Sequence, residues 1–128
     1  MDKAILVDTD VMVDYLRGRD AAVALVKGHA DRILLSAIVV AELYAGVKGE
    51  QEQGVLDELL SVLQVVPVGA GTARAAGLFK RDFGTSHGIG LADAIMAATA
   101  RSENAGLSTL NVKHYPMFKG LRPAYLKK

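Results

Sequence analysis

AILVD, at residues 4–8, is the stretch that decides the fold. It is a short apolar run rich in strand-forming residues, and an acidic side chain closes it. An unbroken apolar run of this length is typical of a strand that is buried on both faces, as in the middle of a parallel sheet. The stretch therefore predicts a central parallel strand that ends at Asp8.

Outward from this strand, helical and strand patterns alternate along the chain. Further strands are predicted at 32–36, 65–68 and 107–110, with a last short one near 122–125. Helices are predicted over 10–17, 20–29, 50–63 and 72–83, with one more that starts after an N-cap at Ser36 and one from Leu91 that Gly106 closes. The alternation predicts a three-layer α/β/α domain with a mostly parallel central sheet, formed as one domain over residues 1–128.

The composition excludes several classes of protein. With 51% hydrophobic and 23% charged residues, the chain is globular and not disordered. The absence of cysteine excludes disulfides and thiolate metal sites. No apolar run approaches the roughly 20 residues that span a bilayer, and the N-terminus does not have the pattern of a signal peptide. We therefore expect a cytoplasmic protein with no membrane partner.

The charges are unevenly distributed, although the net charge is only +1. Residues 113–128 carry Lys and Arg but no acid, whereas the rest of the chain has an excess of acids. A basic segment of this kind attracts a polyanion, and it is equally typical of a solvated terminus.

Three carboxylates lie in apolar sequence without a nearby cation. Asp8 ends the first strand, Glu42 lies in SAIVVAELYAG (36–46) and Asp93 in GIGLADAIMAA (88–98). A buried carboxylate without a partner is costly, and three that converge at one sheet edge raise one another's pKa. A divalent cation removes this repulsion, and a set of oxygen ligands without cysteine suits Mg²⁺ or Mn²⁺.

Two further acids have simpler local explanations. Asp14 lies three residues before Arg17, so the spacing predicts a solvated ion pair on a helix surface. Asp10 follows Asp8 by two residues, and it either caps the next helix or faces the same site.

Four blocks together resemble a known family. They are LVDTDVMVDYLRG (6–18), LSAIVVAELYAG (35–46), GIGLADAIMAATA (88–100) and LSTLNVKHYPMFKGLRP (107–123). In this order and spacing they resemble the PIN-domain family, specifically the VapC-type toxins of type II toxin–antitoxin pairs. The resemblance covers nearly the whole chain.

The resemblance implies roles for residues in the first three blocks. Asp8, Glu42 and Asp93 match the acidic residues that hold Mg²⁺ or Mn²⁺ and are catalytic. Thr9 matches the hydroxyl residue that orders the first acid through hydrogen bonds. The implied activity is that of a metal-dependent endoribonuclease, in which a metal-activated water hydrolyses RNA phosphodiester bonds.

The fourth block departs from the family pattern at one position. Asn111 matches the polar residue that follows the last strand, but His114 stands where many relatives carry another acid. His114 contacts the metal through water, contacts substrate phosphate or is an inert surface residue. The alternative function is therefore a catalytically impaired PIN-like module that binds RNA or protein. A further alternative is a phospho-acceptor receiver-like domain, which also clusters acids at strand ends. Such a domain has a Lys at the end of a late strand, and LSTLN contains none.

Candidate partner surfaces lie on the helix at 72–83 and in the basic segment. Arg74, Leu78 and Arg81 share one helix face, which contacts RNA or a protein partner or is simply solvated. Lys113 and the bases after it are candidates to hold RNA phosphates. The resemblance further implies a cognate antitoxin protein that fills the acidic groove, and a homodimer.

Overall fold

The structure is a computed structural model that describes residues 3–126. Within these residues the sheet has four parallel strands in the order β3-β2-β1-β4. They are β1 (Ile5–Val7), β2 (Ile33–Ser36), β3 (Gln64–Val66) and β4 (Gly106–Ser108). As predicted, β1 is an inner strand, and it pairs with β2 on one side and β4 on the other.

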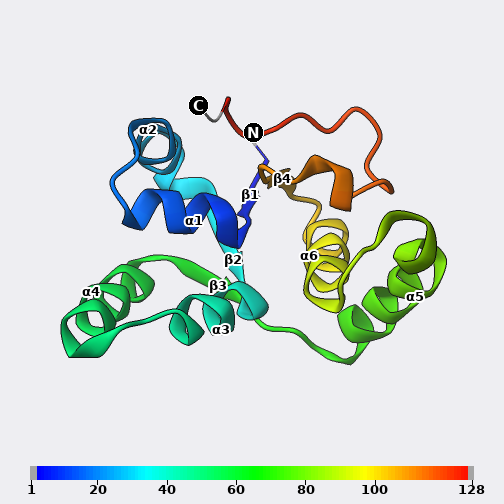
Figure 1. Cartoon of the computed structure of the whole chain (residues 1–128), viewed down its shortest axis with the longest axis horizontal. Coiled ribbons are helices and arrows are strands. Elements are labelled where there is room, and N and C mark those ends of the chain that lie inside the picture. Colours follow the sequence, from blue (N-terminus) through cyan, green and yellow to red (C-terminus); the bar gives the residue numbers. More distant parts are fainter. Residues whose placement is uncertain (1–2, 127–128) are drawn as a thin grey trace.

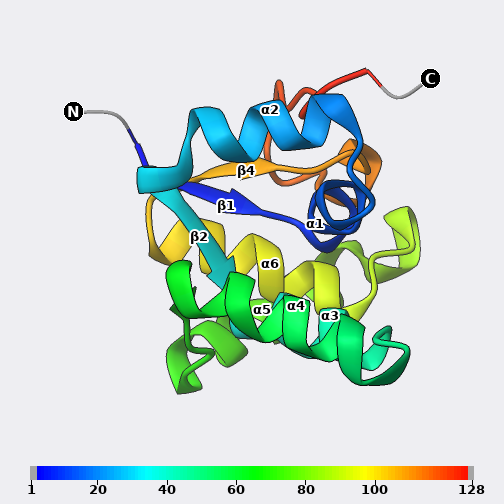
Figure 2. The ribbon, with the colours of Figure 1, turned by 90° about the vertical axis from the view of Figure 1, so that its left-hand side faces the viewer.

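Helices cover both faces of this sheet (Figure 1 and Figure 2). The helices are α1 (Thr9–Leu16), α2 (Asp20–Gly28), α3 (Ala37–Ala45), α4 (Gly49–Val62), α5 (Ala70–His87) and α6 (Leu91–Ser102), with short 3-10 turns η1 (Ala30–Arg32) and η2 (Val112–His114). Helices α1 to α4 lie on one side, and α5 and α6 on the other. The predicted three-layer fold is confirmed. In the described part of the chain, none of these helices has the length and apolar character that crossing a membrane requires.

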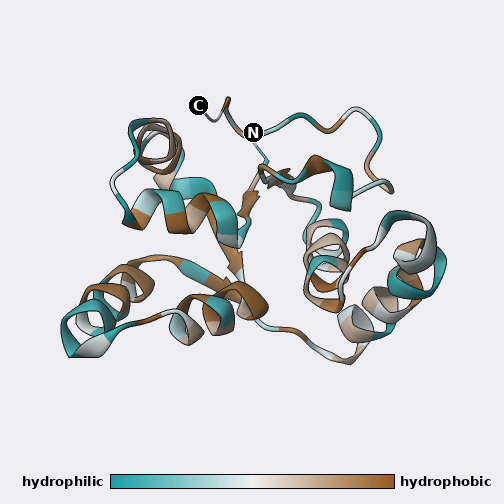
Figure 3. Ribbon diagram, in the orientation of Figure 1, coloured by the Kyte–Doolittle hydropathy of each residue, from teal (hydrophilic) through white to brown (hydrophobic). Residues whose placement is uncertain are grey.

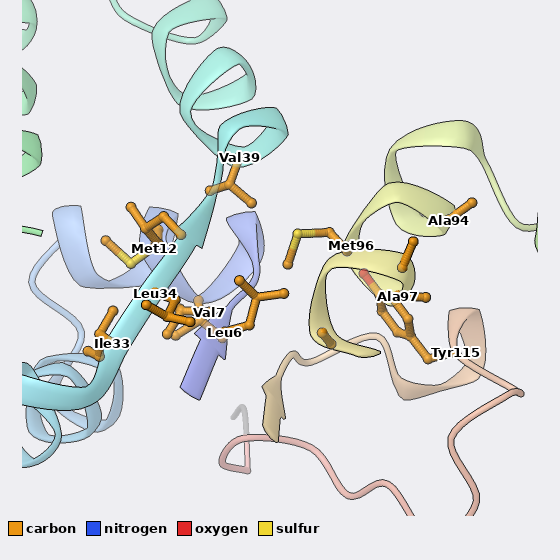
Figure 4. Packing of buried hydrophobic residues seen from close by; sticks show 14 of the residues in the cluster. Leu6, Val7, Met12, Ile33, Leu34, Val39, Ala94, Met96, Ala97 and Tyr115 are labelled. Carbon is orange, nitrogen blue, oxygen red and sulfur yellow. The ribbon is translucent and has the colours of Figure 1, made fainter. Parts of the chain in front are cut away.

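The core lies between the strands and the helices that cover them (Figure 4). The side chains of Leu6, Val7 and Leu35 are fully buried, and Met12 of α1 packs in the same cluster. Figure 3 shows the strands as hydrophobic segments in the middle of the molecule. Burial on both faces explains why β1 and β2 consist of continuous apolar residues rather than alternating ones.

Most predicted boundaries lie within two residues of the observed ones, but those of α5 and α6 differ by more. Helix α6 ends at Ser102, and Gly106 does not close it, because Gly106 is already the first residue of β4. The turn between them contains Asn104, which has a φ of 50°. Asn takes this left-handed conformation more readily than most residues, so it serves where a glycine was expected. Helix α5 is longer than predicted. It ends at His87, and the next residue, Gly88, has a φ of 65°.

The predicted last strand near 122–125 is wrong. This segment returns to the end of β4, where the Ala124 N–H donates to the Thr109 carbonyl at 2.9 Å. Pro123 has no N–H to donate, so a continued ladder is interrupted at that point. The segment also contacts helix α1 through a side chain, because the Tyr125 hydroxyl donates to Asp14.

The prediction of a solvated Asp14–Arg17 pair is also wrong. Asp14 is only 1% exposed, its Oδ2 accepts a hydrogen bond from the Tyr125 hydroxyl at 2.7 Å, and its Oδ1 lies 3.3 Å from Arg19 Nε. The local spacing rule failed because the returning C-terminal segment covers this face of α1. Burial and the hydrogen bond to Asp14 raise the pKa of Tyr125.

Asp14→Ala should lower the free energy of unfolding by about 1.5–3 kcal/mol, which is the usual contribution of a hydrogen bond to a charged group. The Tyr125 hydroxyl and the Arg19 guanidinium both lose their acceptor. Urea denaturation followed by circular dichroism measures the change. Asp82→Ala removes an exposed ion pair with Arg81 and is the control, expected to change stability by less than about 0.5 kcal/mol. Equal losses in the two variants would contradict the role assigned to Asp14.

Candidate active site

The sheet brings polar side chains together where its strands end. Asp8 directly follows β1 and is the N-cap of α1, while Thr109 follows β4 by one residue. Glu42 lies on α3, which begins directly after β2, and Asp93 lies in the first turn of α6. In open parallel sheets, ligands bind beyond the carboxyl ends of the strands, so this edge is the expected place for a site.

Asp8 is held by hydrogen bonds on both carboxylate oxygens. Its Oδ1 accepts from the Thr9 N–H at 2.8 Å. Its Oδ2 accepts from the Thr109 hydroxyl at 2.9 Å and from the Tyr115 hydroxyl at 2.8 Å. Because Asp8 is only 7% exposed, these bonds replace most of its water and fix the orientation of the carboxylate.

Asp93 shares one of these partners with Asp8. The Tyr115 hydroxyl lies 3.2 Å from Asp93 Oδ1 and 2.8 Å from Asp8 Oδ2, so the two carboxylate oxygens are no farther apart than these two distances combined. On its other side, Asp93 Oδ2 lies 3.0 Å from His114 Nδ1. Burial and the negative charge of Asp8 raise the pKa of Asp93, and His114 opposes this rise. Two of the three predicted acids therefore converge.

Glu42 belongs to the same region but differs from its prediction. It is exposed and not buried, and its Oε1 accepts a hydrogen bond from the Thr9 hydroxyl at 2.7 Å. Helix α3 is apolar all round, but only Val39 and Leu43 are buried, so the face that bears Glu42 is open. The hydroxyl of Thr9 thus orders Glu42, and only its backbone N–H serves Asp8. The expectation that the Thr9 hydroxyl orders Asp8 is therefore wrong, because this hydroxyl donates to Glu42.

Asp10 faces the end of β4 and does not cap α1, since Asp8 is the cap. Its Oδ2 accepts from the Leu110 N–H at 2.9 Å and lies 3.4 Å from the Thr109 hydroxyl. Burial and the neighbouring charge of Asp8 raise the pKa of Asp10. Asp10 thus adds negative charge beside Asp8 while it ties α1 to the loop after β4.

The remaining predicted residues have different positions. His114 is not an inert surface residue, because it contacts Asp93. Asn111 is exposed, and it lines a cavity of about 340 Å³ beside Asp10. Lys113 is exposed next to His114 in η2. The other two basic residues are exposed on α5, and one of them pairs with a neighbouring acid: Arg74 and Arg81.

The Asp8–Asp93 pair fits a hard divalent cation. Mg²⁺ takes oxygen ligands, and it binds to one or two protein carboxylates while it keeps waters and substrate phosphates. Burial and the negative charge of Asp8 raise the pKa of Asp93, and a bound divalent ion would offset this repulsion between the two carboxylates. Within residues 3–126 there is no group of three or more His, Cys, Asp or Glu side chains that could hold a metal. The shared three-acid site of Asp8, Glu42 and Asp93 therefore stays a prediction.

Two residues of the site were missed in the sequence. Thr109 is the residue directly after β4, so the rule that selected Asp8 at the end of a strand also selects this hydroxyl. Tyr115 carries no comparable signal, because its contacts with Asp8 and Asp93 span 107 and 22 residues of sequence. Only the fold places it between the two acids.

A groove of about 700 Å³ opens beside Glu42, between helices α1, α3 and α4. Its walls are mainly apolar, and two of its side chains, Leu16 and Val55, are 40% and 55% exposed. Polar groups at its border include Glu42, Arg17 and Lys48. An exposed apolar groove rimmed by charges is typical of a protein-binding surface.

The fold and the site define an α/β domain with an acidic centre at the carboxyl edge of a parallel sheet. The sequence matches the PIN domain family over residues 5–115, so the chain belongs to the PIN-domain family. It is 40% identical to Ribonuclease VapC19 of Mycobacterium tuberculosis, covering 94% of this chain and 98% of that protein. It is 41% identical to Ribonuclease VapC10 of the same organism, covering 94% and 92%.

Solved structures show the same fold. A toxin–antitoxin complex from Klebsiella pneumoniae superposes with a TM-score of 0.82 at 23% identity, covering 95% of this chain and 98% of that one. VapBC2 from Rickettsia felis, bound to a DNA fragment from its promoter, superposes with a TM-score of 0.76 at 28% identity, covering 92% and 95%.

Proposed function

We propose that this chain is a metal-dependent endoribonuclease and the toxin of a toxin–antitoxin pair, acting on RNA in the cytoplasm. The observation that carries the proposal is the convergence of Asp8 and Asp93 on one hydroxyl at the carboxyl edge of the sheet. Its support is the sequence identity with two relatives named as ribonucleases.

The residues of the site have distinct tasks in this function. Asp8 and Asp93 would hold Mg²⁺ or Mn²⁺, with Glu42 as the third acid on the groove side. When bound, the ion supplies charge neutralisation at the phosphate and lowers the pKa of a coordinated water. Thr109 fixes the orientation of Asp8, and Thr9 fixes that of Glu42. Lys113, exposed beside His114, would contact a neighbouring phosphate.

The alternative is a PIN-like module that binds RNA or protein but has lost catalysis. Its motive is His114, which replaces an acid of many relatives. His114 contacts Asp93 from the side away from Tyr115, because it uses the other carboxylate oxygen. The replacement therefore leaves the Asp8–Asp93 pair intact, which favours the active enzyme.

Metal removal tests the proposed function. We expect the purified protein to cleave structured RNA with Mg²⁺ or Mn²⁺, to stop in EDTA and to resume when the ion is restored, since the acids alone supply no charge neutralisation at phosphorus. Cleavage is followed by gel electrophoresis of end-labelled RNA. Cleavage that persists in EDTA contradicts the metal dependence, and an absence of cleavage with either ion favours the binding module.

The groove between α1, α3 and α4 is the proposed binding site of the antitoxin. Structures that superpose on this chain include toxin–antitoxin complexes. The apolar walls at Leu16 and Val55 suit an apolar helix face, and Glu42 at the border suits an Arg or Lys of the same segment. Because Glu42 also receives the Thr9 hydroxyl, a cation placed there would reach the acidic centre as well. Occupation of the groove would thus silence the nuclease.

A further inference from the structure

Tyr115 joins the two converging acids from inside the protein. It is 1% exposed, and among the described residues only its hydroxyl forms hydrogen bonds to both Asp8 and Asp93. A phenol hydroxyl has a single proton to donate, and the two oxygens of a normal O–H···O hydrogen bond are about 2.5–3.0 Å apart. The distances of 2.8 and 3.2 Å therefore indicate that the hydroxyl donates its hydrogen bond mainly to Asp8, and that Asp93 is the weaker second acceptor.

The position of the Tyr115 ring is fixed by its surroundings. Its N–H donates to the Val112 carbonyl at 3.0 Å, and its ring stacks on Phe118 with centroids 6.5 Å apart. Figure 4 shows the ring beside α6, near Ala97, which is 0% exposed. The small alanine side chain lets the ring lie close to the helix that carries Asp93. These contacts hold the Tyr115 ring in the position from which its hydroxyl reaches the two acids.

Packing alone does not require this hydroxyl. Phe would fill the same volume, and a buried hydroxyl costs free energy unless it finds partners. Both partners of this hydroxyl are acids of the site, and burial together with their negative charges raises the pKa of Tyr115, so it stays a donor. The hydroxyl therefore acts on Asp8 and Asp93 rather than on the core.

We propose that Tyr115 is a positioning residue, whose hydroxyl links Asp8 to Asp93 and sets the two carboxylates for a divalent cation. This proposal rests on the proposed function. The hydroxyl of Thr109 donates to the same Oδ2 of Asp8 but forms no hydrogen bond to Asp93, so within residues 3–126 only Tyr115 hydrogen-bonds to both acids. Groups that orient a metal-binding side chain through hydrogen bonds typically change metal affinity 10–100-fold when they are removed.

Tyr115→Phe tests the proposal because it removes the oxygen and keeps the ring. Isothermal titration calorimetry should show Mg²⁺ or Mn²⁺ binding weakened about 10–100-fold. RNA cleavage should need correspondingly more Mg²⁺, and it should approach the wild-type rate at saturating Mg²⁺. Tyr44→Phe is the matched control, because its hydroxyl donates to Asp57 of α4 and not to Asp8 or Asp93. Its Mg²⁺ affinity should equal that of the wild type.

Unchanged Mg²⁺ affinity in folded Tyr115→Phe overturns the proposal, even where the wild type cleaves RNA and needs Mg²⁺. A wild-type protein that neither binds Mg²⁺ nor cleaves RNA overturns both this proposal and the proposed function. Should Tyr115→Phe not fold, ¹³Cζ-tyrosine NMR of the wild type decides, with Tyr115 assigned by elimination from Phe variants of Tyr15, Tyr44 and Tyr125. Its resonance should shift with Mg²⁺ occupancy, and a resonance that does not move refutes the link.

Discussion

Asp8→Asn should lower the rate of RNA cleavage about 10³-fold while the protein stays folded. The side chain keeps its shape, so the Thr9 N–H at 2.8 Å retains an acceptor. The negative charge is lost, however, and with it one of the two carboxylates that meet at Tyr115. A divalent ion contributes several kcal/mol to phosphoryl chemistry, and about 1.4 kcal/mol corresponds to each tenfold in rate.

Single-turnover cleavage of end-labelled RNA at fixed Mg²⁺ measures the loss. Asp20→Asn is the control, because Asp20 is exposed in the first turn of α2 and has no part in the site. Circular dichroism should show both variants folded, since removing a charge near Asp10 and Asp93 relieves repulsion. Cleavage by folded Asp8→Asn at the wild-type rate would exclude Asp8 from the catalytic centre.

Leu16→Asp should weaken antitoxin binding at least about 100-fold and leave RNA cleavage unchanged. Leu16 is 40% exposed on α1 and lines the groove, so a bound apolar segment would bury the new carboxylate without a partner. The few residues that dominate an interface contribute about 2 kcal/mol or more, and about 3 kcal/mol corresponds to 100-fold in Kd. The expected protein is a nuclease that its antitoxin no longer silences.

Val62→Asp is the matched control for this substitution. Val62 is 78% exposed on α4, and it does not line the groove. Calorimetric titration of each variant with the cognate antitoxin, followed by RNA cleavage with and without antitoxin, separates binding from activity. Wild-type affinity in Leu16→Asp, or an equal loss in Val62→Asp, would place the antitoxin elsewhere on the molecule.

Sequence patterns predicted the features that depend on short stretches of chain. AILVD indicated β1, and Ser36 indicated the start of α3, where its side chain accepts from the Ile38 N–H. Asp8 could be selected because the carboxyl end of a strand in such a fold is a general site for ligands. These inferences need only local propensity and the layer rule, and the structure confirms the fold that they imply.

The errors arose where distant segments meet. Asp14 satisfies the local spacing for an exposed pair with Arg17, but the returning C-terminal segment buries it against Tyr125. Glu42 was expected to be buried because its neighbours are apolar, yet it lies on an exposed face of α3 and lines an open groove. In both cases, the burial of the side chain is decided by elements that no local pattern describes.

The pairing of β1 with β4 has a consequence for how the protein gains its activity. The hydroxyl of Thr109 reaches Asp8 across 101 residues of sequence, and Tyr115 reaches it across 107. Contacts of such long sequence separation form slowly, because the chain must close a large loop before they stabilise anything. An intermediate in which β1, β2 and β3 have assembled would carry Asp8 without its orienting hydroxyls. We therefore expect the hydroxyls that orient Asp8 to reach it only when the two ends of the chain have folded together.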